Sequence, residues 1–280
     1  MPEAPDLEAI RSFLAPRICG VTIGSAMVRI PIVARFPKEE FSDRLVGTRF
    51  SAIDRRGKFL LFRLESGRIL AVNPMLTGRF QYVQPKERMR AKTCAVIGFE
   101  SGFELRYVDA NLMGKLYLVD EAALATVPQF SEMGPDVLDP SLTETVFRAQ
   151  LKRHPGMVKN ILVNHTVVAG IGNAYADEIL FVAGIHPYRK RSELSDEQLT
   201  RLYWAIGVVM DWAIPIIAEH MRDELAYDEW RAHLRVHRKG GQPCPVCGNP
   251  ISEITAGQRI TTLLPAVSTV KAFSSQLTKR

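Results

Sequence analysis

The first residues of the chain, Met-Pro-Glu, could do covalent chemistry. Initiator methionine is normally removed before a small residue, which would leave Pro2 as a free secondary amine. An α-amino group has a pKa of about 7.7–8.0, and a helix beginning beside it disfavours the charged form. Such an amine attacks an aldehyde carbon to give an iminium ion, and Glu3 could move protons. An initiator followed by proline and an acid is also a common start with no chemical role.

Two glycine turns could bind phosphate. Lys58 follows Gly57 at the start of an apolar strand, where a lysine is usually only solvated but can also reach a phosphate. Gly170 and Gly172 directly precede a predicted helix, whose first backbone N–H groups suit an anion. This second turn resembles a dinucleotide fingerprint, but Tyr175 replaces the third glycine and no strand–helix–strand unit surrounds it. NAD binding is therefore rejected, and a tight turn between helices remains the alternative.

A pair of cysteines begins a zinc motif near the end of the chain. Cys244 and Cys247 have the spacing of a zinc knuckle, but no Cys or His follows them. A closed structural zinc site takes four ligands. His233 and His237 could complete an unusual site of two histidines and two cysteines. Otherwise the cysteines pack in a turn without metal.

Composition sets broad limits. The 280 residues include 36 Lys and Arg against 30 Asp and Glu, giving a net charge of +6. This excess weakly favours a polyanionic partner, and the basic residues gather in turns such as 54–58, 150–159 and 233–241. No signal peptide, disulfide framework or apolar run of membrane-spanning length is evident. We therefore expect a cytoplasmic protein.

The periodicity of the chain predicts an α+β multidomain fold. An amphipathic helix is expected at 5–15, and short alternating runs over 21–119 predict an antiparallel β-sandwich or barrel. Turns at Gly57, at 65–67, at 100–102 and at the Asn-Pro of 73–74 are read as hairpins. From about Asp139 the pattern is helical, and Ser195 with Gln198 resembles a capping box. A Gly- and Pro-rich hairpin follows residue 235.

These segments predict four parts along the chain. They are a β-sandwich domain with its leading helix (1–130), a helical domain (131–235), a finger-like hairpin (236–270) and a tail (271–280).

Taken together, the motifs resemble the formamidopyrimidine-DNA glycosylase and endonuclease VIII family of base-excision repair enzymes. "MPEAPDLEAI" resembles the family's N-terminus, "RRGKFLLF" its lysine hairpin and "GGQPCPVCGNPI" the opening of its zinc finger. "GPDVLD" and "MVKNILVNHTVVAGIGNAYADEILFVAGIHP" are similar to its helix–two-turn–helix domain. The resemblance covers nearly the whole chain.

The resemblance implies a catalytic role for three residues. Pro2 would attack C1′ of the damaged nucleoside and form a Schiff base as the base leaves. Glu3 would protonate the sugar ring oxygen and relay protons, and Lys58 would hold a phosphate near the lesion. The damaged nucleotide must leave the stack to reach such a site. β- and then δ-elimination would cut the strand.

The resemblance also implies DNA-binding residues. Lys159 and Asn173 would grip phosphates around the flipped nucleotide, assisted by the turn of Gly170 and Gly172. Arg259, in "AGQRITT", matches a finger arginine that contacts phosphate.

The finger departs from the family, in which two further cysteines follow the arginine. Leu264 and Val267 stand at those positions. We expect a finger without zinc, in which a small apolar core replaces the metal; its members are Ile251, Ile254, Leu263, Leu264 and Val267. The site with His233 and His237 remains a rival.

The residues that would fill the space of the flipped base also differ. Leu76, in "NPMLTG", stands for a methionine of the family, and Met113, in "DANLMG", for its phenylalanine. Both side chains can still wedge between bases. Asn111 and Leu112 replace two arginines, and Asn111 lacks the guanidinium fork that reads an opposite cytosine. We therefore expect weak discrimination of the opposite base, with oxidised purines, oxidised pyrimidines and abasic sites all possible substrates.

The main hypothesis is a bifunctional DNA glycosylase and abasic-site lyase that acts on damaged double-stranded DNA and needs no cofactor. We expect a monomer associated with the nucleoid and not with a membrane. One alternative is a damage-binding protein with weak catalysis, which the altered wedge residues allow. Another is an RNA- or ribosome-binding module, for which a free N-terminal proline has no use.

Overall fold

The computed structural model describes residues 1–256 and 259–263. The chain divides into two compact units, each of which is built from two segments. Met1–Glu132 and Ile214–Trp230 form the first unit, and Met133–Ala213 and Arg231–Arg280 form the second. Segment 214–230 thus belongs with the N-terminal unit, whereas the predicted parts place it in the helical domain (131–235). The predicted domain bounds themselves stay a prediction.

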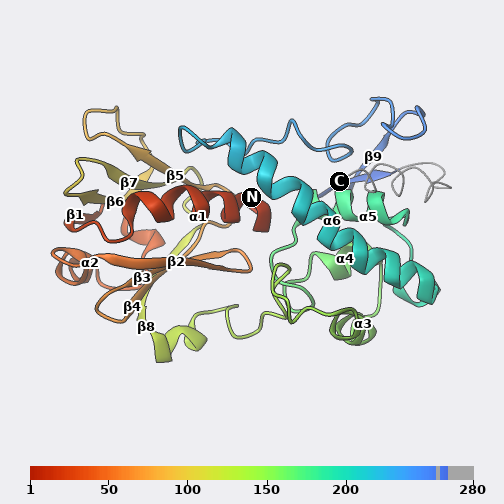
Figure 1. The fold of residues 1–280 in the computed structure, drawn as a ribbon, viewed down its shortest axis with the longest axis horizontal. Helices are drawn as coiled ribbons and strands as arrows, with labels where there is room; N and C mark the ends of the chain where they lie inside the picture. Colours follow the sequence, from red (N-terminus) through yellow and green to blue (C-terminus); the bar gives the residue numbers. More distant parts are fainter. Residues whose placement is uncertain (257–258, 264–280) are drawn as a thin grey trace. The chain divides into compact units, whose positions relative to one another are not determined.

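The first unit is an antiparallel β-sandwich with a leading helix, as expected (Figure 1). One sheet has the order β1-β6-β7-β5 and the other β2-β3-β4-β8. The strands are β1 (Ile23–Val28), β2 (Phe50–Arg56), β3 (Phe59–Leu64), β4 (Arg68–Asn73), β5 (Gly78–Val83), β6 (Thr93–Phe99), β7 (Glu104–Asp109) and β8 (Lys115–Asp120). The helical elements are α1 (Ala4–Ile18), α2 (Lys38–Leu45) and the short 3₁₀ turns η1 (Pro31–Val33) and η2 (Glu121–Thr126).

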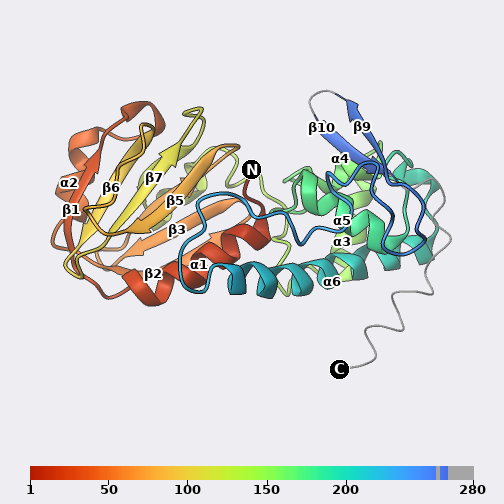
Figure 2. The same cartoon turned by 90° about the horizontal axis from the view of Figure 1, so that it is seen from above.

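Aromatic side chains fill the space between the sheets. The ring centroids of Phe50 and Phe62 lie 5.4 Å apart, those of Phe62 and Phe80 6.1 Å, and those of Phe80 and Tyr107 5.5 Å. Phe62 and Phe80 come from different sheets, so this row of rings joins the two layers. Helix α1 lies along β2 (Figure 2) and buries Leu7, Ile10 and Leu14, the three apolar residues whose spacing predicts it.

One turn differs from its expectation. The turns at Gly57, 65–67 and 100–102 do join paired strands, but the Asn-Pro of 73–74 is not a hairpin. It leads from β4, which pairs with β8, into β5, which pairs with β7 in the other sheet. A local turn signal cannot tell a hairpin from a crossing between sheets, because the difference lies in the long-range pairing.

The second unit is helical with a C-terminal hairpin, as the sequence predicts. Its helices are α3 (Glu144–Lys152), α4 (Val158–Leu162), α5 (Asn173–Ala183), the turn η3 (Arg191–Glu193) and the greater part of α6 (Asp196–His220). The capping box before α6 is confirmed: the Ser195 N–H donates to the Gln198 side chain and the Gln198 N–H to the Ser195 hydroxyl. Strands β9 (Ser252–Ala256) and β10 (Arg259–Leu263) form the hairpin.

Helix α6 is long and apolar enough to cross a membrane by length and composition, contrary to the expectation that no segment is. A core helix of a soluble protein passes the same test. Within the second unit, α6 buries a row of side chains, which are Leu202, Ala205, Ile206, Val209, Met210 and Ala213. One face of α6 thus packs into the core of the second unit.

Candidate active site and nucleic-acid interface

The residues predicted to do chemistry lie at the start of α1. Glu3 is the N-cap of this helix, is 2% exposed, and donates its backbone N–H to Asp6 Oδ2 at 2.8 Å. Pro2 is also buried. Met1 is present, so the Pro2 nitrogen belongs to a peptide bond, and the Met1 ammonium lies 2.6 Å from Glu229 Oε1. A carboxylate of segment 214–230 therefore faces the N-terminus.

Glu229 also binds a cation from the sandwich. Its Oε1 lies 2.9 Å from an Arg79 guanidinium nitrogen on β5. Two positive groups thus share this carboxylate, which is largely buried. The sequence carries no local signal for this contact, because the partners are far apart in the chain.

Lys58 lies at the tip of the hairpin between β2 and β3, as predicted. Arg56 pairs with Phe59, which leaves Gly57 and Lys58 as a two-residue turn, and Gly57 takes the left-handed conformation at φ +57°. Arg55 ties the turn to α1. It donates to the Gly57 carbonyl at 3.0 Å and lies 3.4 Å from Glu8 Oε2. The hairpin of Lys58 and the helix that carries Glu3 are thereby joined.

The predicted wedge residues lie on two exposed loops. Leu76, between β4 and β5, is 47% exposed, and Met113, between β7 and β8, is 36% exposed. Asn111 is also exposed. The structure thus leaves all three side chains at the surface of the first unit.

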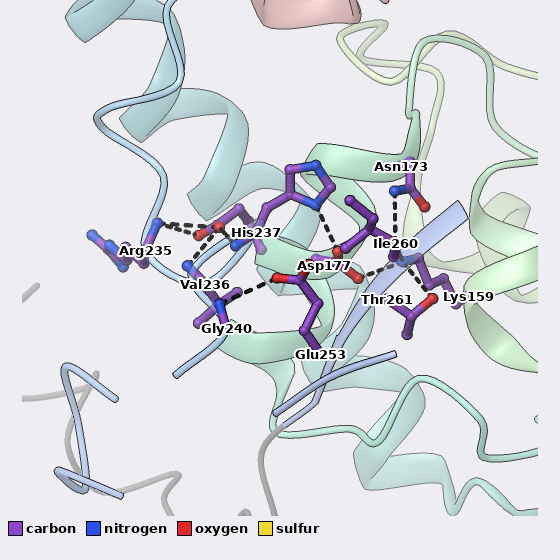
Figure 3. A network of polar contacts seen from close by, with 11 residues as sticks. Lys159, Asn173, Asp177, Arg235, Val236, His237, Gly240, Glu253, Ile260 and Thr261 are labelled. Carbon is purple, nitrogen blue, oxygen red and sulfur yellow. Dashed lines mark hydrogen bonds and ion pairs between the residues drawn. The ribbon is translucent and has the colours of Figure 1, made fainter. Parts of the chain in front are cut away.

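In the second unit, Lys159 is buried and its ammonium group binds the protein itself (Figure 3). It lies 2.6 Å from Asp177 Oδ1 and donates to the Ile260 carbonyl at 2.9 Å and the Thr261 hydroxyl at 3.0 Å. Asn173, the first residue of α5, donates its side-chain N–H to the same carbonyl at 2.8 Å. Both predicted phosphate ligands thus hold strand β10 against the helical part of this unit. Their phosphate contacts stay a prediction.

Helix α5 also fixes the segment that leads into the finger. Glu178 accepts the backbone N–H groups of Arg235, Val236 and His237 at 2.9–3.2 Å. His237 Nδ1 lies 2.7 Å from Asp177 Oδ2 (Figure 3). Burial raises the pKa of Glu178, and its three hydrogen bonds and Arg235 act in the opposite direction.

The finger residues do not fit a zinc site. Cys244 is buried and Cys247 exposed. Both histidines of the rival site are engaged elsewhere: His233 Nε2 lies 3.1 Å from the Tyr175 hydroxyl, and His237 contacts Asp177. Among the described residues no three His, Cys, Asp or Glu side chains are grouped to hold a metal.

Other predicted finger and turn residues are placed only in part. Of the proposed apolar core, Ile251 is buried but Ile254 is 45% exposed, and Leu263 is the last residue of β10. Leu264 and Val267 lie outside the described residues, as does the tail at 271–280. Arg259 is the first residue of β10. Gly172 is the N-cap of α5, and Gly170 has a φ of +107°, as a tight turn before a helix requires.

Known proteins match this chain along most of its length. A formamidopyrimidine-DNA glycosylase of Heliobacterium modesticaldum is 35% identical over 273 residues, covering 95% of this chain and 99% of the relative. One of Listeria innocua is 32% identical over 270 residues, covering 95% and 98%. The chain belongs to the formamidopyrimidine-DNA glycosylase family. Family models for its N-terminal domain, its helix–two-turn–helix domain, and the zinc finger found in these enzymes and isoleucyl-tRNA synthetase match residues 1–116, 133–224 and 241–263.

Solved structures of the formamidopyrimidine-DNA glycosylase family have the same fold. A Lactococcus lactis enzyme in complex with abasic-site DNA superimposes with a TM-score of 0.85 at 26% identity, covering 94% of this chain and 98% of that chain. Its complex with DNA containing N7-benzyl-Fapy-dG gives 0.86 at 27% identity, with the same coverage. The finger match ends at residue 263, before the two positions at which the sequence lacks cysteines.

Proposed function

We propose that Pro2, after removal of Met1, is the nucleophile of a DNA glycosylase and abasic-site lyase that removes oxidised bases from double-stranded DNA. Family membership gives the enzyme class, a DNA glycosylase of base excision repair with lyase activity, and damaged DNA as its partner. The observation that carries the proposal for Pro2 is its position. It is buried at the N-terminus of α1 beside Glu3, and Arg55 links this helix to the hairpin of Lys58.

The proposed reaction uses an amine and a carboxyl group and requires no cofactor. The Pro2 nitrogen attacks C1′, the C1′–base bond breaks and the base leaves with a proton. Glu3 protonates the sugar ring oxygen, which opens the ring and gives an iminium ion between Pro2 and C1′. Loss of a proton from C2′ then expels the 3′ phosphate, and a second elimination expels the 5′ phosphate. Lys58 holds a phosphate beside the lesion.

The proposed DNA interface combines phosphate contacts with a wedge. Lys159 and Asn173 grip phosphates around the flipped nucleotide, assisted by the turn of Gly170 and Gly172, and Arg259 contacts a phosphate. Affinity should therefore fall steeply with salt. Leu76, Met113 and Asn111 fill the space of the flipped base without a guanidinium fork, so the opposite base is read weakly.

We further propose a monomeric, cytoplasmic and nucleoid-associated protein whose finger binds no zinc. The finger supplies two thiols and no third ligand among the described residues. Metal analysis that finds about one zinc per chain would contradict this part of the proposal.

Strand incision tests the proposal. Duplexes with one oxidised purine, one oxidised pyrimidine or one abasic site are incubated with the protein and with its Glu3→Gln variant. We expect incision with products of β- and δ-elimination, and a loss of about 100-fold or more in the variant. Tight binding to all three duplexes without any product would instead identify a damage-binding protein.

A further inference from the structure

Two loops at one end of the sandwich cross between its sheets side by side. The first, residues 74–77, joins β4 to β5, and the second, residues 110–114, joins β7 to β8. Both loops leave paired strands: Gly78 pairs with Asp109 in one sheet, and Asn73 pairs with Lys115 in the other. The two crossings are therefore held together at both of their ends.

A buried carboxylate joins the two loops. Asp109 is 0% exposed. Its Oδ1 accepts the hydroxyl of Thr77 from the first loop and the backbone N–H of Asn111 from the second, the latter at 3.2 Å. Its Oδ2 accepts the Gly114 N–H at 2.6 Å and the Tyr107 hydroxyl at 3.4 Å. One side chain thus satisfies donors of both crossings.

Tyr107 fills the space between the loops. A Cβ atom added at Gly78 would lie 2.2 Å from the Tyr107 hydroxyl oxygen, and one added at Gly114 would lie 1.7 Å from it. Glycine at both positions is what lets the hydroxyl reach Asp109. Burial raises the pKa of Tyr107, and the charge of Asp109 raises it further, so the phenol keeps its proton and remains a donor.

The loops present apolar side chains in an unfavourable backbone conformation. Leu76 and Met113 are 47% and 36% exposed. Their neighbours Met75 and Leu112 have φ values of +50° and +56°, in the left-handed region that L residues other than glycine rarely adopt. Such a conformation persists only where surrounding contacts fix it. The Met75 N–H donates to Asn73 Oδ1 at 3.1 Å and the Leu112 N–H to the Asp109 carbonyl at 3.3 Å, and the Asp109 carboxylate joins the two loops to each other.

We propose that Asp109 and Tyr107 are positioning residues that fix Leu76 and Met113 as one rigid wedge for the DNA duplex. The inference rests on the proposed function and deepens it. Both side chains are buried, so their role is to position the loops and not to contact the substrate. They act by holding two loops in one arrangement before DNA binds, so that no ordering of the loops is required on binding.

Replacing Asp109 with asparagine would remove one of the two acceptor oxygens while keeping the shape of the side chain. Each carboxylate oxygen accepts one backbone N–H, from Asn111 on one side and Gly114 on the other. An amide has only one acceptor oxygen. In one orientation its NH₂ group faces the buried Gly114 N–H, which loses its acceptor. In the other it removes the acceptor of the Thr77 hydroxyl and leaves the Asn111 N–H only its contact with Thr77 Oγ1 at 3.2 Å. Asp43→Asn, an exposed exchange on α2, is the matched control.

The test compares lyase activity on an abasic site in duplex and in single-stranded DNA, because only the duplex requires a wedge. For Asp109→Asn we expect about a tenfold or greater loss on the duplex and an unchanged rate on the single strand. Tyr107→Phe should show the same pattern more weakly, and Asp43→Asn no change. Equal losses on both substrates would overturn the inference, since they indicate a general structural role, and so would no loss on either.

A second readout separates this inference from the proposed function. 2-Aminopurine placed opposite the abasic site becomes more fluorescent when it unstacks, and this requires binding only. We expect the increase with the unaltered chain and with Asp43→Asn, but not with Asp109→Asn. Equal increases in all three would overturn the wedge inference. An increase without incision by the unaltered chain would overturn the proposed lyase function alone.

Discussion

The ammonium group of Lys159 lies 2.6 Å from a carboxylate oxygen of Asp177, and both side chains are buried. The other two donors of the ammonium bind Ile260 and Thr261 of β10. This ion pair supplies part of the attachment of the hairpin. Lys159, on α4, thereby holds β10, whose first residue is Arg259, against Asp177 of α5.

Removing this lysine should destabilise the second unit. In Lys159→Met a buried carboxylate loses its nearest cation, which typically costs about 3–5 kcal/mol. Denaturant unfolding measures the loss. The matched control is Lys152→Met on α3, an exposed lysine, which should change the free energy of unfolding by less than about 0.5 kcal/mol. Equal effects of the two substitutions would show that the ion pair of Lys159 and Asp177 adds nothing to the free energy of unfolding.

Glu178 predicts a particular dependence of stability on pH. Burial raises its pKa above 4.5, so the folded state holds the proton more tightly than the unfolded state does. Its contribution to stability is therefore fully present below the unfolded pKa, and it is lost as pH rises through the folded pKa. The free energy of unfolding of the native chain, relative to Glu178→Gln, should fall as pH rises from about 4.5.

Glu144 is a control whose contribution to stability should change with pH in the opposite direction. Hydrogen bonds from Thr200 and Arg148 lower its pKa, so its contribution is present above the unfolded pKa and is lost as pH falls. Relative to Glu144→Gln, the native chain should gain stability as pH rises. The two differences in the free energy of unfolding should therefore change with pH in opposite directions. If they changed in the same direction, burial would not be the main influence on the pKa of Glu178.

The contact between Gly114 and Tyr107 predicts a rescue. Gly114→Ala places a methyl group against the Tyr107 hydroxyl and should lower cleavage of duplex abasic DNA about tenfold. Adding Tyr107→Phe removes the nearest atom and should restore part of the rate. Single-turnover cleavage by the single and double variants measures this. Additive losses would mean that the two residues do not share the space.

Asn111 predicts weak reading of the opposite base. Asn111→Arg supplies a guanidinium fork on the same loop and should increase the preference for cytosine about tenfold, the usual value of one bidentate contact. The measurement is incision of one lesion opposite each of the four bases. Asn111→Gln, which lengthens the side chain without a fork, should leave the preference unchanged. A strong cytosine preference in the unaltered chain would contradict the account.

Local patterns predict elements of both units. The spacing of Leu7, Ile10 and Leu14 locates α1, and the two-residue turn at Gly57 places Lys58. The capping box of Ser195 and Gln198 marks the start of α6. These features depend on residues within a few positions of one another, so a single sequence contains them.

Long-range contacts are what the sequence does not reveal. The crossing at 73–74 depends on which distant strand β5 pairs with. The same holds for the partners of Lys159 on β10 and for the carboxylate of Glu229 that faces Met1. Asp109 lies inside a quoted motif, yet its burial and its four donors follow only from the pairing of two loops.

Borohydride trapping tests the central claim most directly. The protein, with its N-terminus confirmed by mass spectrometry, is mixed with duplex DNA that carries one abasic site, and borohydride reduces any iminium ion to a stable bond. We predict a covalent protein–DNA product for the native chain and none for Pro2→Gly, with DNA binding retained by both. No covalent product from a native chain that lacks Met1 and binds the DNA would contradict the proposal that Pro2 is the nucleophile.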